Sequence, residues 1–263
     1  MIQVINVSKR FLHNIVLDGV SLEVRDGETV ALLGPSGVGK SVLLKHINGL
    51  MKPDAGDVIV DGLSVPRLKR KEIQQLRSKI GYVFQYGALF DSMSVYENIR
   101  LGITDETCAN DDGYCNDRVK ECLRLVNLAP DVAEKYPAEL SGGMRKRVGI
   151  ARAIAGKPKY LLYDEPTSGL DPVNADVIDG LVERLQDELG VTSVVVSHDV
   201  RGSFRVADRV ALLWQAKIRA VGKPEEILQS RDPAVQQFME RDLEMALIQS
   251  ESETDRETHG PDV

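Results

Sequence analysis

The sequence predicts an α/β protein with a mostly parallel sheet, an antiparallel sheet at its edge and an inserted helical subdomain. Three apolar runs, at residues 30–33, 161–163 and 194–196, lack polar alternation, which is typical of parallel strands covered on both faces. Each run is followed directly by glycine-rich or polar residues. About 120 residues separate the glycine-rich residues after the first run from the acids after the second, far more than one crossover needs, so we expect much of residues 86–158 to form a helical lobe.

The first 24 residues predict the antiparallel edge sheet. Residues 1–11, MIQVINVSKRF, read as a strand, residues 13–19 include a turn, and residues 16–24 read as the second strand. Phe11 follows a basic pair in the short loop between them. An aromatic ring there could stack on a purine base, and the alternative for Phe11 is simple core packing.

The first apolar run leads into residues 34–41, GPSGVGKS, the phosphate-binding loop pattern G-x-x-x-x-G-K-S. Glycines at 34, 37 and 39 allow positive φ and let main-chain N–H groups approach phosphate oxygens, while the next helix presents its positive end. Lys40 would contact the β and γ phosphates of a nucleotide, and the Ser41 hydroxyl would face Mg²⁺. The alternative is a chance loop.

The other two runs end in acids and in Ser197-His198-Asp199. Asp164 would hold the same Mg²⁺ through water, which leaves Glu165 free to orient an attacking water. The carboxyl ends of parallel strands share one edge of a sheet, so these groups are expected to converge with the loop. The alternatives are a solvated strand end for the acids and an ordinary polar turn for His198.

A helix start comes before the acids. Ser141, Gly142 and Gly143 open a helix whose first-turn amides form an anion site. The three basic residues 145–147 oppose the helix dipole, which fits a helix start that awaits an anion; the alternative is a solvated basic face. A turn ending in Asp171 and Pro172 then begins another helix.

Over residues 2–230 these motifs resemble the nucleotide-binding subunits of ABC transporters. GPSGVGKS looks like the Walker A motif, LSGG the signature, YLLYDE the Walker B strand, and SGLD the D-loop. In that family two subunits pack head to tail, and each LSGG completes the γ-phosphate site of the other. The resemblance implies catalytic roles for Glu165, His198 and Gln85, and Mg²⁺ contacts from Ser41, Gln85 and Asp164. The residues implied to bind ATP are Phe11, Gly34, Pro35, Ser36, Gly37, Val38, Gly39, Lys40, Ser41, Ser141, Gly142, Gly143 and Asp171.

Within the family, residues 84–99 and 141–155 are most similar to the ATPases of Mla- and Mce-type phospholipid transporters. The markers are Met144 after LSGG and the Gly-Ala-Leu-Phe sequence at residues 87–90. This resemblance implies a homodimer beneath a membrane permease dimer, on the cytoplasmic face of the inner membrane. A Mce-type lipid-binding subunit and a small STAS-type regulatory protein are further implied partners. Residues 87–91 are where a permease helix would dock; the alternative is that they belong to the core of the lobe.

Three other functions remain open. The ATPase could serve an importer for a small polar solute such as an amino acid, act on DNA or the ribosome, or be an unrelated P-loop enzyme. DNA-repair relatives insert long coiled coils and translation relatives carry two ATPase domains, and neither pattern occurs here. The net charge of −7 argues against general nucleic-acid binding, which needs clustered Lys and Arg.

The start of the sequence lacks a signal-peptide pattern and no apolar run approaches a membrane span, so a cytosolic protein with three reduced cysteines is expected. A C-terminal extension is expected at residues 231–248, because Val235, Phe238 or Met239, Leu243 and Leu247 recur at helical spacing after Asp232-Pro233. It would dock on a neighbouring subunit or regulator, or else pack on its own domain. Residues 249–263 are acidic and are expected to be disordered.

Overall fold

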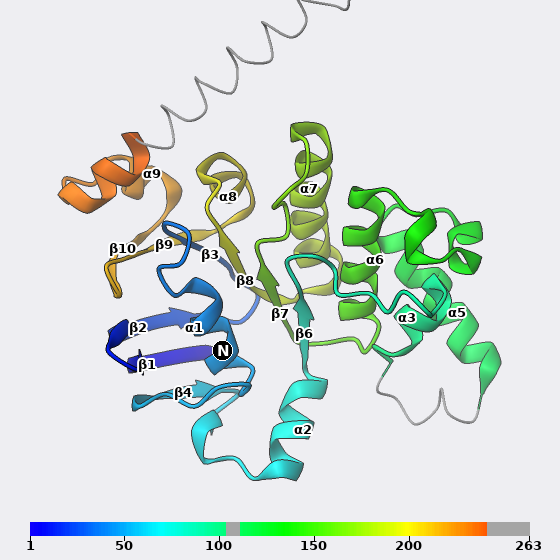
Figure 1. The fold of residues 1–263 in the computed structure, drawn as a ribbon, viewed down its shortest axis with the longest axis horizontal. Helices are drawn as coiled ribbons and strands as arrows, with labels where there is room; N and C mark the ends of the chain where they lie inside the picture. The colour runs from blue at the N-terminus through cyan, green and yellow to red at the C-terminus, as the bar shows by residue number, and fades with distance from the viewer. Residues whose placement is uncertain (104–110, 241–263) are drawn as a thin grey trace, which may run out of the picture.

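The structure is a computed structural model that describes residues 1–103 and 111–240. Its framework is two sheets, one of six strands in the order β10-β9-β3-β8-β7-β6 and one of four in the order β2-β1-β4-β5 (Figure 1). Within the six-stranded sheet all neighbouring pairs are parallel except β9 and β10. The predicted α/β fold, with a mostly parallel sheet and an antiparallel edge sheet, is therefore confirmed.

The three apolar runs lie side by side at the centre of the large sheet. They become β3 (Thr29–Leu33), β7 (Tyr160–Asp164) and β8 (Thr192–Ser197), with β8 in the middle. Nearly every residue of these strands is buried, as expected of strands covered on both faces. The outer strands are β6 (Ile80–Val83), β9 (Arg209–Trp214) and β10 (Lys217–Gly222).

The antiparallel sheet consists of β1 (Ile2–Phe11), β2 (Asn14–Val24), β4 (Ala55–Val60) and β5 (Leu63–Ser64). The second strand thus begins two residues earlier than predicted, and the turn is shorter. Helix α1 (Lys40–Ile47) follows β3 and buries Leu43, Leu44 and Ile47 in one cluster with residues of both sheets. This shared core fixes the phosphate loop, which comes just before α1, against the large sheet.

The helical lobe lies beyond β6 and β7 on the side away from α1 (Figure 1). It includes α3 (Val95–Arg100), α5 (Asp112–Leu125) and α6 (Gly142–Ile154), whose apolar faces share one core cluster with α7 (Pro172–Leu189). Further helical segments are α2 (Arg70–Ser78), α8 (Val200–Val206), α9 (Pro224–Leu228) and the 3₁₀ turns η1 (Val65–Arg67), η2 (Pro130–Glu134) and η3 (Pro137–Glu139).

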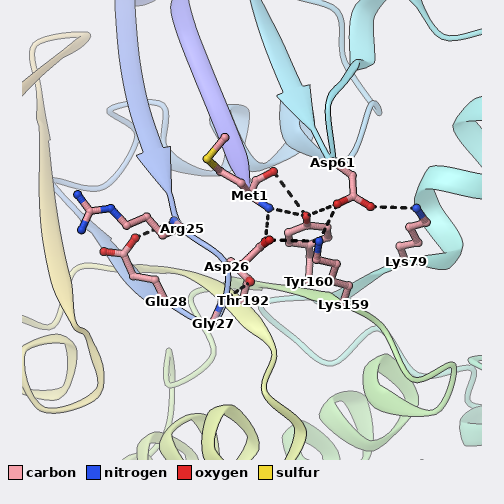
Figure 2. A network of polar contacts seen from close by, with 10 residues as sticks. All are labelled: Met1, Arg25, Asp26, Gly27, Glu28, Asp61, Lys79, Lys159, Tyr160 and Thr192. Carbon is pink, nitrogen blue, oxygen red and sulfur yellow. Dashed lines mark hydrogen bonds and ion pairs between the residues drawn. The ribbon is translucent and has the colours of Figure 1, made fainter.

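At the amino end of β7, a polar network joins the two sheets (Figure 2). The Asp61 carboxylate, in the turn between β4 and β5, accepts hydrogen bonds from Lys79, Lys159 and the Tyr160 hydroxyl at 2.7 to 3.0 Å. The two lysines, Lys159 first, hold the pKa of Asp61 far below its usual range. Because these contacts lie at the opposite end of β7 from Asp164, they anchor the sheets without entering the predicted site.

Residues 233–240 are helical, and their apolar stripe packs on the chain's own domain. Val235 and Phe238 are buried in a cluster with Leu212 and Ile227, and the Phe238 ring meets Trp214 edge-on at 6.5 Å between centroids. For this part of the extension the structure therefore shows the second of the two predicted alternatives. Leu243, Leu247 and the acidic tail at 249–263 lie outside the described residues.

Of the two cysteines that the structure describes, one differs from expectation. Cys122 is free and buried on α5, but Cys115 is disulfide-bonded, so the prediction of three reduced cysteines is wrong for Cys115. The even spacing of cysteines along a polar segment carried no signal for a disulfide. Cys108 lies outside the described residues.

Candidate active site at the carboxyl edge of the sheet

The glycine-rich loop takes a conformation that only glycine fits at two positions. Gly34 has φ of 151°, and a Cβ there would lie 2.2 Å from the Leu213 carbonyl oxygen. Gly39 has φ of 114°, and its Cβ would lie 2.8 Å from a Val16 methyl group. The loop is thus pressed against β9 and β2, and its main chain is free to bend around a phosphate group.

Lys40 is 4% exposed and points back into this loop. Its ammonium donates to the carbonyl of Gly34 at 2.6 Å and of Pro35 at 3.1 Å, and lies 3.7 Å from a Glu165 carboxylate oxygen. Burial lowers the pKa of Lys40, and the charge of Glu165 opposes that shift. The lysine predicted to contact phosphates therefore lies between the loop and the strand-end acids.

Ser41 and Asp164 lie in direct contact, although they are 123 residues apart in the sequence. The Ser41 hydroxyl donates to Oδ1 of Asp164 at 2.6 Å, and the Tyr82 hydroxyl donates to Oδ2 at 2.9 Å. A hydroxyl and a carboxylate are oxygen donors of the kind Mg²⁺ prefers. Among the described residues no three His, Cys, Asp or Glu side chains form a metal cluster. A cation held by these two donors would take its other ligands from water and phosphate, as Mg²⁺ does in ATPases.

Glu165 is the residue on which the other side chains converge. Gln85 donates to Oε2 of Glu165 at 3.2 Å, and Nδ1 of His198 lies 3.4 Å from the same oxygen. The pKa of Glu165 is lowered, chiefly by the hydrogen bond with His198 and also by Lys40. The pKa of His198 is raised for the same reason. Glu165 is thus held as a carboxylate, the form that can accept a proton from water.

The backbone at Glu165 is unusual as well. Its φ is 49°, a left-handed value that costs a non-glycine residue roughly 1–2 kcal/mol. The main-chain N–H donates to the Val196 carbonyl on β8 at 2.9 Å. Strain of this kind persists only where the surroundings enforce it, and it is common at active sites.

The predicted helix start at Ser141 lies apart from this cluster. Ser141 caps α6 by accepting a hydrogen bond from the Met144 N–H at 3.2 Å, and Ser141 and Gly142 are exposed. The nearest neighbours of a Cβ on Gly142 and Gly143 are Leu170 and Asn174 rather than the glycine-rich loop. The structure therefore leaves the first turn of α6 open to a ligand from outside the chain.

Asp171 lies next to this helix start, at the beginning of α7. It caps α7 through hydrogen bonds from the main chain and the side chain of Asn174, at 3.0 and 2.6 Å.

Phe11 ends β1 and is 42% exposed, with the Lys9 ammonium 5.7 Å from its ring centroid. A cavity of about 400 Å³ beside Gly37 and Val38 is lined by Asn14, Ile15, Val16, Asp18, Gln215 and Ala216; Phe11 is not part of that lining.

Two residues of this region, Tyr82 and Gln215, were not predicted from the sequence, and Lys146, one of the basic residues 145–147, makes contacts that were not predicted. Tyr82 contacts Asp164, Gln215 lines the cavity, and Lys146 donates to the main chain at Glu165 and Ser168. For Tyr82 a signal did exist, because a polar aromatic residue in an otherwise apolar strand needs a partner for its hydroxyl. Nothing in the pattern around Gln215 separated it from a solvated residue, and for Lys146 neither an anion site nor a solvated basic face predicted its contacts with main-chain carbonyls.

A glycine loop facing a strand-end aspartate and glutamate at the carboxyl edge of a parallel sheet is how P-loop proteins hold and hydrolyse ATP, so the fold and the site define a P-loop ATPase. The ABC transporter family profile matches residues 17–168. The chain is 38% identical to the intermembrane phospholipid transport ATP-binding protein MlaF of Haemophilus influenzae, over 91% of this chain and 90% of that protein. It belongs to the ABC transporter family, as an ATP-hydrolysing cassette.

Two further comparisons agree on the family but not on a cargo. The methionine import ATP-binding protein MetN of Carboxydothermus hydrogenoformans is 43% identical over 85% of this chain and 66% of that protein. The dimeric ATP-binding cassette MJ0796, in a post-hydrolysis state with ADP and Pi, superposes with a TM-score of 0.75 at 34% identity, covering 85% of this chain and 99% of that one. Cassettes of this family function as dimers with membrane permease partners. Within residues 1–103 and 111–240, none of the helices has the length and apolar character needed to cross a bilayer.

Proposed function

We propose that this cassette hydrolyses Mg²⁺-bound ATP to drive phospholipid movement through a separate membrane permease, with Mla/Mce-type partners. The observation that carries the proposal is the similarity to the phospholipid transport protein MlaF along nearly the full length of both chains. Met144 after the signature glycines and the Gly-Ala-Leu-Phe segment at 87–90 support the same subfamily. The similarity to the methionine importer favours the alternative, an importer for a small polar solute.

In the proposed reaction, Lys40 and the loop amides would bind the β and γ phosphates, and Ser41 and Asp164 would hold Mg²⁺, which would supply positive charge against the phosphates. Glu165 orients and deprotonates the attacking water. Its carboxylate lies beside Lys40, and it accepts no hydrogen bond from Ser41, which donates to Asp164 instead. His198 and Gln85 support Glu165 through the contacts described above.

The exposed first turn of α6 completes the site of a second copy, so the working unit is a head-to-tail homodimer. The support is that Ser141 and Gly142 are exposed, whereas α1, which follows the glycine-rich loop, lies on the other side of β6 and β7 from α6 in Figure 1. Mixing mutants tests this arrangement. Pairing Ser141→Arg on one chain with Lys40→Ala on the other leaves one intact composite site, so the heterodimer should retain nucleotide. Failure to retain nucleotide at either site would count against completion by the partner.

The experiment that tests the cargo is purification of the ATPase with its native membrane partners, followed by mass spectrometry of the co-purifying chains and lipids. A permease with a Mce-type lipid-binding subunit, a small STAS-type regulator and bound phospholipid is the expected result. Co-purification with an amino-acid-binding subunit instead would overturn the lipid assignment and favour the alternative.

A further inference from the structure

Lys146 lies in the second turn of α6 and is buried, with 6% of its surface exposed. Its ammonium donates to the Ser168 carbonyl at 2.8 Å and contacts the Glu165 carbonyl at 3.4 Å. Among the described residues its hydrogen-bond partners are therefore main-chain carbonyls and no carboxylate. Lys146 thus connects the helix that begins at Ser141 with the turn that carries Glu165.

A cation in this position is costly. Burial lowers the pKa of Lys146 to about 8, and only the charge of Glu165 opposes that shift. Removing an ammonium from water without a paired carboxylate is unfavourable, and an unbranched apolar side chain of similar length would fill the same space at no such cost. The charge therefore needs a reason beyond packing.

The turn at residues 165–168, which Lys146 contacts, is also contacted by Gln85. Gln85 donates to the Glu165 carboxylate at 3.2 Å and to the Ser168 hydroxyl at 3.3 Å. The Glu165 carbonyl additionally accepts from the Ser168 N–H at 3.2 Å. Gln85 thus restrains the side chains of the turn and Lys146 restrains its carbonyls, at a residue whose φ of 49° is left-handed. Loss of either restraint leaves this strained backbone free to relax.

The same helix start touches the turn at a second point. A Cβ on Gly143 would lie 2.7 Å from Oδ1 of Asn174, whose side chain is bonded to Asp171. The first turn of α6 is therefore packed closely against Asn174 and is also joined to the turn through Lys146. Two close contacts of this kind make α6 and residues 165–174 one mechanical unit.

We propose that Lys146 is a positioning residue that couples the helix start at Ser141 to the geometry of Glu165 in the same chain. This inference rests on the proposed head-to-tail homodimer. In that dimer Lys146 links two ATP sites: the partner's site, which Ser141 of this chain completes, and this chain's own site, in which Glu165 acts. A nucleotide bound at the first turn of α6 determines the position of Lys146, and the Lys146 contacts determine the main-chain conformation of Glu165.

The test compares Lys146→Met, which keeps the length and removes the charge, with Lys146→Arg, which restores a donor. Lys146→Met should lower kcat about 10²-fold, as expected when a catalytic group is misplaced by about 1 Å, while the KM for ATP changes less than about twofold. The Hill coefficient for ATP should fall from about two toward one. Lys146→Arg should recover most of the kcat and of the cooperativity.

Arg118→Met is the matched control. Arg118 is also a buried cation that donates to two main-chain carbonyls, those of Ile154 and Ala155, but at the far end of α6 from Glu165. Unlike Lys146, it donates to a carboxylate as well, that of Glu121 at 2.6 Å. It should lower thermal stability and leave kcat and the Hill coefficient of the folded protein unchanged. If Lys146→Met keeps the wild-type kcat and Hill coefficient, or changes them only as Arg118→Met does, the proposal is overturned. A wild-type Hill coefficient of one would instead contradict the coupling between the two ATP sites of the proposed dimer. The kcat of Lys146→Met, compared with that of Arg118→Met, would still decide the role of Lys146.

Discussion

Gln85 and Glu165 lie in hydrogen-bond contact, with 3.2 Å between Nε2 and Oε2, although 80 residues separate them in the sequence. Gln85 follows β6, the strand next to the helical lobe, whereas Glu165 follows β7. The residue proposed to activate water is therefore tied directly to the segment that leads into residues 87–91, where a permease is expected to dock. This contact offers a physical route from a membrane partner to hydrolysis.

Replacing Glu165 by Gln should abolish hydrolysis while ATP binding remains. Loss of a positioned general base costs roughly 10²–10⁴-fold in rate, and the isosteric amide keeps the shape of the side chain with one oxygen that can still accept from Lys40 or from Gln85. Unhydrolysed ATP should then hold two copies together, which size-exclusion chromatography with light scattering would detect. Lys40→Ala is the control and should weaken nucleotide binding itself. Normal steady-state turnover of Glu165→Gln would show that another residue acts as the base.

The pKa of His198 should fall when Glu165 is replaced by Gln, because the Glu165 carboxylate is the main reason that it is raised. In the wild type, the stabilising contact is fully present below the ordinary histidine pKa of about 6.5 and is lost as the pH rises through the raised value. The NMR titration of the imidazole Cε1 proton, assigned with His198→Gln, measures both proteins. An unchanged His198 pKa in Glu165→Gln would contradict the contact.

Tyr82→Phe should weaken the response to Mg²⁺. The Tyr82 hydroxyl orients the Asp164 carboxylate so that Oδ1 faces Ser41, and loss of such an outer contact typically costs 10- to 100-fold in metal affinity. Mn²⁺ binding in the presence of a non-hydrolysable ATP analogue, followed by electron paramagnetic resonance, measures the change directly.

Tyr163→Phe provides a matched control for that experiment. The Tyr163 hydroxyl is buried one residue before Asp164 and has no hydrogen-bond partner within residues 1–103 and 111–240. Its removal should leave Mn²⁺ affinity unchanged and slightly raise thermal stability, because an unsatisfied polar group is lost. Equal effects of the two substitutions on metal affinity would rule out a special role for Tyr82.

Truncation after Arg231 should destabilise the isolated subunit, because it removes the buried side chains of Val235 and Phe238. Loss of a buried Phe side chain alone typically costs about 3 kcal/mol or more, which calorimetry would detect as a lower Tm. Truncation after Gln249 should change neither stability nor ATPase activity. Equal Tm values for the two truncations would contradict the packing of residues 233–240 on Trp214.

The central strands and the phosphate loop were predictable because local sequence determines them. An unbroken apolar run such as 194–196 indicates a doubly covered strand, and the rule that parallel strands end at one edge brought Ser41, Asp164 and His198 together. Contacts that depend on side-chain reach between distant elements, such as Tyr82 to Asp164 and Lys146 to Ser168, leave no periodic trace. Likewise, the spacing of Val235 and Phe238 predicted an apolar stripe but could not say which surface covers it.

ATP-dependent movement of a fluorescent phospholipid between membranes, driven by the purified complex of this cassette with its native permease, tests the proposed function most directly. We expect transfer with ATP and Mg²⁺, none with the Glu165→Gln complex, and no uptake of radiolabelled methionine. ATP-dependent uptake of the amino acid without lipid transfer would contradict the assignment.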